Sequence, residues 1–166
     1  MTRPYLMFPD KRLRTVCAEV EQVDDGVRAV WDEMLAAMYI MPGVGLAGPQ
    51  LGEMRRLAVV DCSEGRDQPL RMANPEVLHA STKLREHEEG SPNIPKLWAI
   101  VARPRAITAR FMDEHGKVVE QDFVGLWATS VQHQIDHLNG KLFVDHLSAV
   151  KRKMMLAKHA KNMKRR

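Results

Sequence analysis

The sequence predicts a single α+β domain in which antiparallel strands lie around a central helix that carries an H-x-x-x-H pair. Three observations lead to this prediction. A helix-like segment over residues 125–138 follows several short apolar segments with strand character. The chain has 166 residues with 45% hydrophobic content, which suits one sizeable core. No internal repeat, low-complexity tract or linker divides it, so we expect one domain over residues 1–166.

The first predicted helix begins near Asp24 or Asp25, either of which can cap it, and runs to about Tyr39. Apolar side chains recur along one face at helical spacing, as expected for a helix that packs on a core. These residues are Val27, Val30, Trp31, Met34, Leu35 and Met38. Pro42 and Gly43 then end the helix and open a loop.

Strand-like segments fill the middle of the chain. The apolar run over residues 57–60 predicts a buried strand. Residues 77–86 and 99–101 are predicted strands of an antiparallel sheet. Residues 106–112 and 118–123 are expected to pair as a hairpin around the intervening D-E-H-G turn.

Two further helices are predicted. The helix over residues 125–138 places one set of side chains on a common face, one turn apart. These residues are Leu126, Thr129, Ser130, His133 and His137. Asn139 and Gly140 provide its stop. Ser148 can cap a last helix over about residues 148–164.

The positive charge of the chain is concentrated at its C-terminus. The net charge is +4, but residues 151–166 hold eight Lys or Arg and no acidic residue. Residues 1–150 therefore carry 17 basic against 21 acidic residues. This distribution favours a basic terminal arm over a broadly basic surface that coats nucleic acid.

The sequence indicates neither a membrane protein nor an oxidising compartment. It has no run of about 18 apolar residues, the length that a membrane span needs. Residues 1–5 lack the apolar core and cleavage site of a secretory signal. Cys17 and Cys62 do not make a disulfide framework. We therefore expect a cytoplasmic protein.

Residues 133–137, with the sequence HQIDH, match a zinc-hydrolase helix motif that lacks its general base. In an H-E-x-x-H helix the two histidines share a metal, and the glutamate takes a proton from the metal-bound water. Here Gln134 stands at the position of the glutamate, and an amide cannot take a proton at neutral pH. For the pair alone, two helix histidines that merely pack or face solvent remain the alternative.

Two other segments give this motif a context. Residues 43–50, with the sequence GVGLAGPQ, follow the first helix, and residues 89–95, EGSPNIP, lie between predicted strands. In this order the three segments resemble the peptide deformylase signatures G-x-G-L-A-A-P-Q, E-G-C-L-S and H-E-x-D-H. The resemblance extends from residue 8 to residue 145. It implies the deformylase fold and a metal-dependent reaction that removes the formyl group from the initiator methionine of nascent bacterial proteins.

By this resemblance the metal ligands would be His133, His137 and the residue at position 91. The family has a cysteine there, whereas this chain has Ser91. A thiolate binds metal strongly, but a serine hydroxyl stays protonated and is a poor substitute. A small turn residue is the alternative role for Ser91. We expect no tightly bound metal, and Fe²⁺, Zn²⁺ or Ni²⁺ by family resemblance if any is held.

By the same resemblance, a general base and a backbone N–H donor are also expected to be missing. Because Gln134 replaces the base, general acid–base help of about 10²–10⁴-fold should disappear. The family also uses a backbone N–H just after the ligand cysteine to bind the formyl oxygen, and Pro92 has no N–H. Losing one such donor costs about 10²–10³ in rate. Gln50 could still donate to that oxygen, or it could be a buried amide that braces two loops.

Other family positions are retained. The segments that would bind substrate by resemblance include Gly43, Gly45, Leu46 and Pro92. Glu89 and Arg103 match residues expected to form an ion pair beneath the active-site loops, and Asp136 matches a structural carboxylate of the H-E-x-D-H motif. A retained scaffold around an altered reaction centre is typical of a pseudoenzyme.

The basic C-terminal helix predicts a second contact. In bacterial deformylases that the chain resembles, such a helix docks on the ribosome near the exit of the nascent chain. Lys158, Lys161 and Lys164 could make phosphate contacts of this kind. The apolar side of this helix is expected to hold Val150, Met154, Ala157 and Ala160. A solvated surface helix is the alternative.

We therefore predict a deformylase-like protein that has lost or nearly lost deformylation and binds a nascent formyl-peptide, another peptide or the ribosome. One alternative is a weakly active, metal-dependent deformylase or amidase with an altered ligand set. Another is a general RNA-binding protein on the same scaffold. Metal content and turnover separate the first two, and salt-sensitive RNA binding tests the third.

Overall fold

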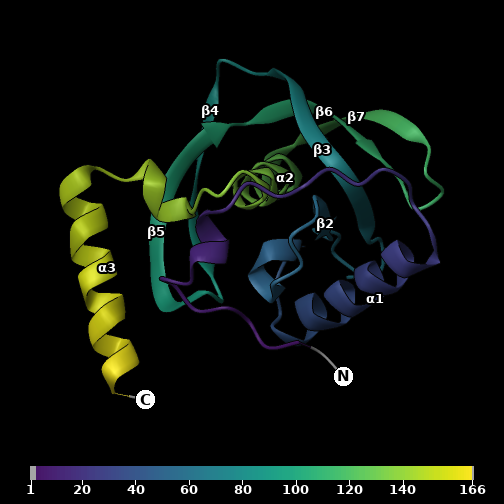
Figure 1. The fold of residues 1–166 in the computed structure, drawn as a ribbon. Helices are drawn as coiled ribbons and strands as arrows, with labels where there is room; N and C mark the ends of the chain where they lie inside the picture. Colours follow the sequence, from purple (N-terminus) through teal and green to yellow (C-terminus); the bar gives the residue numbers. More distant parts are fainter. Residues whose placement is uncertain (1–2, 166) are drawn as a thin grey trace.

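The computed structural model describes residues 3–165, which form two antiparallel sheets and three α-helices (Figure 1). The larger sheet has the strand order β1-β2-β3-β6-β7, and the smaller sheet pairs β4 with β5. The strands are β1 Gly45–Ala47, β2 Leu57–Val60, β3 Leu70–Ala80, β4 Leu84–Ser91, β5 Ile94–Pro104, β6 Ala106–Met112 and β7 Val118–Val124. The helices are α1 Asp25–Ile40, α2 Gly125–Leu138 and α3 Ala149–Lys164. The predicted fold class is confirmed.

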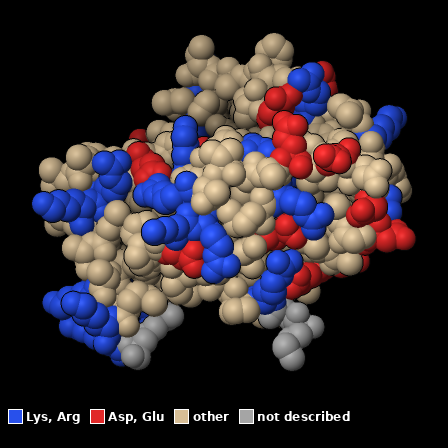
Figure 2. Space-filling view, in the orientation of Figure 1, with Lys and Arg blue, Asp and Glu red and all other residues tan. Residues whose placement is uncertain are grey.

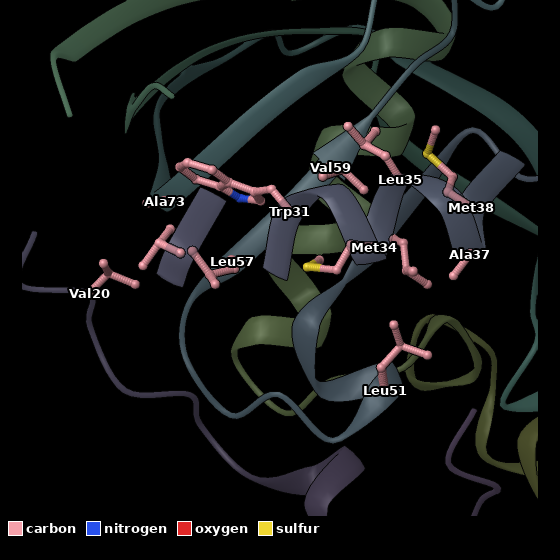
Figure 3. Packing of buried hydrophobic residues seen from close by; sticks show 12 residues of the cluster. Val20, Trp31, Met34, Leu35, Ala37, Met38, Leu51, Leu57, Val59 and Ala73 are labelled. Atoms are coloured by element: carbon pink, nitrogen blue, oxygen red, sulfur yellow. The ribbon is translucent and has the colours of Figure 1, made fainter. Parts of the chain in front are cut away.

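Helix α1 packs against β1 and β2 and forms much of the first core cluster (Figure 3). Asp24 caps it as predicted, because its carboxylate accepts the Val27 N–H at 2.9 Å. Trp31 is fully buried, and its indole N–H donates to a carbonyl of β3 at 3.2 Å. The predicted apolar stripe is confirmed, with the differences that Val30 is only partly buried and Ala37 joins the core.

The strand predictions hold for β2 and for the β6–β7 hairpin, which pairs from Ala106 with Val124 to Met112 with Val118. The single strand predicted over residues 77–86 is wrong. That segment joins the end of β3 to the start of β4 across a bend at residues 81–83. The chain changes sheets there, since β3 pairs with β6 while β4 pairs with β5. Strand-forming residues continue through both segments, so the pattern did not reveal the corner.

Helix α2 lies in the middle of the molecule and contacts strands of both sheets. Val131 and Ile135 pack with Phe111 of β6 in the second core cluster. The helix stops at Asn139 as predicted, and Gly140 takes the left-handed conformation with φ of 75° that favours glycine. This central position holds both predicted metal-binding histidines inside the domain.

Helix α3 stands at one side of the molecule, next to β5 (Figure 1). Ser148 caps it as predicted. The predicted apolar side is wrong, because Val150 and Met154 are 69% and 68% exposed. The inward side is instead formed by Leu156 and by His159, whose Nε2 donates to a carbonyl of the N-terminal segment at 2.7 Å. None of the helices within residues 3–165 is long and apolar enough to cross a membrane.

Candidate active site

Two histidines of α2 face each other inside the domain. The Nε2 atoms of His133 and His137 are 3.1 Å apart. His137 is fully buried, and this burial, together with the neighbouring His133, holds its pKa well below the ordinary value, so its ring is neutral. Nδ1 of His133 lies 2.8 Å from a carboxylate oxygen of Glu89 and therefore carries the ring proton. Two imidazole nitrogens thus converge on one point, with a carboxylate that orients one of the rings.

A buried ion network lies behind His133. Arg103 donates to the two carboxylate oxygens of Glu89 at 2.7 and 2.9 Å and to Asp136 at 2.9 Å. Nε2 of His146 lies 2.7 Å from the same Asp136 oxygen. Burial alone would raise the pKa of Glu89, but hydrogen bonds from Arg103 and His133 lower it to about 2. The predicted Glu89–Arg103 ion pair is present, and Asp136 belongs to the same network.

Ser91, at the end of β4, is hydrogen-bonded to two amide side chains. Gln50 Nε2 donates to Asn93 Oδ1 at 2.7 Å and to Ser91 Oγ at 3.2 Å. Ser91 Oγ donates to Asn93 Oδ1 at 3.0 Å. Gln50 Oε1 accepts the backbone N–H of Ala47 at 2.9 Å. The amide donors of Gln50 are engaged within the protein, so in this arrangement Gln50 braces two loops, which is the second of the roles considered for it.

Asn93 is a site residue that sequence reasoning missed. It is fully buried, and its Nδ2 donates to the carbonyls of Leu6 and Gln50. The backbone carbonyl of Asn93 accepts the backbone N–H of Phe8 at 3.0 Å. Asn93 therefore joins the N-terminal segment to both loops of the centre. The signal in the sequence was an Asn after Pro92 in a tight strand connection, where Asn side chains commonly bond nearby backbone groups.

A pocket of about 520 Å³ opens beside His133, between β4, α2 and residues 41–45, whereas the buried His137 is not part of its wall. Its wall brings together most of the predicted site residues. They are Gly43, Gly45, Gln50, Glu89, Ser91, Pro92, His133 and Gln134. Leu46, predicted at a substrate-binding position, lies in the first core cluster and not in this wall. The three motifs of the sequence therefore meet in one cavity.

Gly45 allows β1 to approach α2 closely in the pocket. A Cβ atom on Gly45 would lie 2.3 Å from Gln134 Nε2 and 2.5 Å from Ser130 Oγ, so a side chain at this position would force α2 side chains to move. Gln134 is 4% exposed and donates to Ser130 Oγ at 3.4 Å. Its Oε1 has no hydrogen-bond partner among the described residues. A buried acceptor without a partner is unusual, and an N–H that reached this oxygen would satisfy it.

The histidine pair fits a divalent cation, but the third position does not complete the site. Ser91 Oγ is engaged with Gln50 and Asn93, and a neutral hydroxyl is a weak ligand. Within residues 3–165, no group of three or more His, Cys, Asp or Glu side chains is arranged to hold a metal. A cation held by His133 and His137 would keep its other positions open to solvent or ligand.

The basic residues predicted to contact phosphate lie apart from this pocket. Lys158, Lys161 and Lys164 are exposed on α3, and none of them is part of the pocket wall. Figure 2 shows basic side chains gathered over the end of this helix. The structure therefore separates the predicted ribosome contact from the predicted reaction centre.

Comparison with known proteins identifies the family. Residues 2–153 match the family model described as Polypeptide deformylase. A peptide deformylase of Hydrogenovibrio crunogenus is 45% identical over 95% of this chain and 93% of its own length. The peptide deformylase of Methylocella silvestris is 44% identical over 98% of this chain and 85% of its own length.

The fold of the chain is also similar to solved structures of peptide deformylases. The peptide deformylase of Legionella pneumophila superposes with a TM-score of 0.91 at 38% identity and covers 99% of this chain and 96% of its own. The Ehrlichia chaffeensis enzyme in complex with actinonin gives 0.92 at 31% identity, with 97% of each chain covered. A structure from Acinetobacter baumannii with bound Met-Ala-Ser gives 0.83 at 29% identity, covering 89% of this chain and 99% of its own. The chain belongs to the peptide deformylase family.

Proposed function

We propose that the protein binds N-formylated peptide ends in the pocket beside His133 and His137 and removes the formyl group weakly, with a divalent cation held by these histidines. The observation that carries the proposal is the convergence of their Nε2 atoms, 3.1 Å apart, with Glu89 on the other nitrogen of His133. The family supports it too, because relatives at 44% and 45% identity are named peptide deformylases.

The residues of the pocket favour binding over turnover. A divalent cation, when bound, supplies Lewis acidity for amide hydrolysis. Gln134 can accept an N–H or hold a water, but it cannot take a proton. Pro92 offers no N–H to a developing oxyanion, and the Gln50 amide already donates to Ser91 and Asn93. The lost base and the lost donor together predict a rate at least ~10⁴-fold below that of an intact family member.

A peptide-binding protein without hydrolysis is the second candidate. The observation that favours it is the engagement of Ser91 Oγ with Gln50 and Asn93, which leaves the cation only two protein ligands. A formyl-peptide could still occupy the pocket, with its amide N–H on Gln134 Oε1. The two candidates differ in whether added metal produces turnover.

An anaerobic assay of formyl-Met-Ala-Ser with Fe²⁺, Ni²⁺, Co²⁺ or Zn²⁺ tests the proposal. We expect slow deformylation that requires the metal and that disappears in His133→Ala and His137→Ala. His115→Ala, which changes a histidine with a 79% exposed side chain, is the matched control and should behave like the unaltered protein. Peptide binding without turnover under every metal would favour the second candidate. Absence of both binding and turnover would contradict both.

We also propose the ribosome as a macromolecular partner, contacted through α3. The support is that Lys158, Lys161 and Lys164 are exposed, while His159 holds the opposite side of the helix on the domain. Such binding should be strong at low salt and fade steeply as salt rises. Co-sedimentation with ribosomes, compared with binding to free RNA, separates this contact from general RNA binding. The proposal implies a cytoplasmic protein.

A further inference from the structure

The loop that joins β2 to β3 holds one wall of the pocket from outside. We call residues 41–45 the wall segment, because they line the pocket, whereas none of residues 61–69, all within the described part of the chain, lines it. The Gly43 carbonyl accepts from NH2 of Arg66. The backbone N–H of Asp61 donates to the Val44 carbonyl at 3.0 Å. Two backbone carbonyls of the wall segment are therefore fixed by a loop that lies outside the pocket.

Arg66 is itself held in place by its neighbours. Its NH1 donates to the Asp61 carbonyl at 2.6 Å, so the planar fork of the guanidinium spans one carbonyl of the loop and one of the wall segment. The guanidinium also lies over the ring of Tyr39, 5.2 Å from its centroid. The backbone of Arg66 has φ of 55°, a left-handed conformation that few residues other than glycine adopt and that persists where surrounding contacts determine it.

Asp61 joins this loop to the end of α1. It is fully buried, and its carboxylate accepts from the hydroxyls of Tyr39 and Ser63 and from the backbone N–H of Gln68 at 3.2 Å. Burial would raise the pKa of Asp61, but the hydrogen bonds from Ser63 and Tyr39 hold it below its ordinary value, so the carboxylate is ionised. Tyr39 lies in the last turn of α1. We call Tyr39, Asp61 and Arg66 the loop clamp.

The wall segment needs this support because glycine makes it flexible. Gly43 and Gly45 flank Val44, and glycine loses more conformational freedom on ordering than any other residue. Gly45 must nevertheless stay so close to α2 that a Cβ atom would lie 2.3 Å from Gln134 Nε2. The Val44 carbonyl also accepts from Ser130 Oγ of α2 at 3.1 Å. A shift of the wall segment would therefore change the space between it and α2, where the pocket lies.

Resting on the proposed function, we propose that Arg66 is a positioning residue, which holds the Gly43 carbonyl so that the wall segment already has the conformation that a formyl-peptide binds. Tyr39 and Asp61 support Arg66, and none of the three lines the pocket. A preformed wall removes the need to order two glycines on binding, and this raises affinity without adding a contact. Loss of the guanidinium should loosen the wall segment and weaken binding, while the rest of the fold stays as it is.

Arg66→Met tests the proposal, because it keeps an apolar stem and removes both donors. We expect amide exchange in residues 43–47, followed by mass spectrometry, to become about 10-fold faster. The Kd of formyl-Met-Ala-Ser, measured by isothermal titration calorimetry on the full chain with Ni²⁺, should rise about 5-fold. Arg66→Lys should recover part of both effects, since an ammonium group cannot span both carbonyls. Arg66→Gly relieves the positive φ but should still weaken binding, which assigns the effect to the guanidinium.

Arg28→Met is the matched control. Arg28 also donates to two backbone carbonyls, those of Glu114 at 2.9 Å and Val23 at 3.3 Å, and it lies outside the pocket wall. Both variants should lower the midpoint of thermal unfolding by about 2–4 °C, through lost hydrogen bonds. Only Arg66→Met should change the exchange of residues 43–47 and the affinity for the peptide.

The outcomes separate this inference from the proposed function. Unchanged exchange or unchanged affinity in Arg66→Met, or an equal loss of affinity in Arg28→Met, would overturn the inference and leave the proposed function intact. If Arg66→Met fails to fold by circular dichroism, Tyr39→Phe, which removes only the hydroxyl bonded to Asp61, should give a smaller effect in the same direction. If the unaltered protein binds no formyl-peptide, the proposed function fails and the inference fails with it.

Discussion

The reaction centre and the ion network behind it differ sharply, although they share a strand. Ser91 and Glu89 are two residues apart on β4, and each belongs to one of the two regions. The network of Glu89, Arg103 and Asp136 is complete, with every carboxylate paired. At the centre, Ser91 and Gln134 stand where the motifs that the sequence resembles have a cysteine and a glutamate, and both are buried polar residues that keep hydrogen bonds.

This difference has a physical reason. Removing one member of a buried ion network leaves an uncompensated charge, which the fold does not tolerate well. Replacing a thiol by a hydroxyl, or a carboxylate by an amide, nearly preserves the shape of the side chain and leaves a neutral polar group that nearby groups can hydrogen-bond. The reaction centre can therefore lose its chemistry while the fold is retained, whereas the network behind it cannot change so freely.

The largest effect is expected from Arg103→Met, which breaks the network. Arg103 is 4% exposed, and its removal would leave the buried Glu89 and the partly buried Asp136 without their shared cation. We expect the free energy of unfolding to fall by about 3–5 kcal/mol, measured by urea denaturation. Arg110→Met, which breaks the exposed pair with Glu76, should cost at most about 1 kcal/mol. Equal costs for the two variants would show that burial does not distinguish the pairs.

The next largest effect should come from restoring the centre itself. Ser91→Cys with Gln134→Glu returns both the thiolate and the base, and we expect kcat/KM for a formyl-peptide to rise about 10²-fold. Each single change should give much less, because a metal without a base and a base without a firmly held metal are both ineffective. Pro92 should limit the gain, since its missing N–H is not restored. A double variant no faster than either single one would mean that the surrounding geometry has also been lost.

Much of the fold was predictable because the signals were local. The cap at Asp24, the apolar stripe of α1 and the glycine stop of α2 depend on nearby residues, and the structure has each of them. The corner between β3 and β4 was missed, since it depends on which sheet each strand joins. The rotation of α3 was missed for a similar reason. His159 is buried, and its ring donates to the backbone carbonyl of Phe8, which is a contact between opposite ends of the chain.

In the candidate site, too, motifs predicted some features, whereas others depend on how distant segments pack. Motif order and spacing predicted that Gly45, Ser91 and His133 would share one cavity, and they do. The commitment of Gln50 to Asn93 could not be read from a motif, because it depends on how two loops fold against the N-terminal segment. The hydrogen bond from Arg66 to Gly43 likewise follows from the packing of the loop after β2 on the wall segment.

A smaller loss of stability is expected from changing Asn93, which joins the loops of the reaction centre to the N-terminal segment. Asn93→Ala would leave the carbonyls of Leu6 and Gln50 and one donor of Gln50 unpaired inside the protein. We expect a loss of about 1–3 kcal/mol in the free energy of unfolding. Ser91→Ala removes only a hydroxyl from the same network and should cost about 1 kcal/mol or less. Thermal unfolding followed by circular dichroism measures both, and a reversed order would place Ser91 rather than Asn93 at the centre of the bracing.

The smallest effect on stability should come from reversing charge on α3, far from both regions. Changing Lys158, Lys161 and Lys164 to glutamate leaves the buried His159 in place, so the free energy of unfolding should change by no more than about 0.5 kcal/mol. Ribosome co-sedimentation at low salt should nevertheless fall strongly, because three attractive charges become repulsive toward phosphate.

The matched control for this variant reverses three exposed lysines in connections elsewhere in the chain. These residues are Lys83, Lys117 and Lys141. Both variants have the same net charge, so a difference in binding reports position and not total charge. Equal loss of ribosome binding in the two variants would mean that the contact is unspecific attraction. Undiminished binding of the α3 variant, with the fold intact by circular dichroism, would exclude α3 as the docking element.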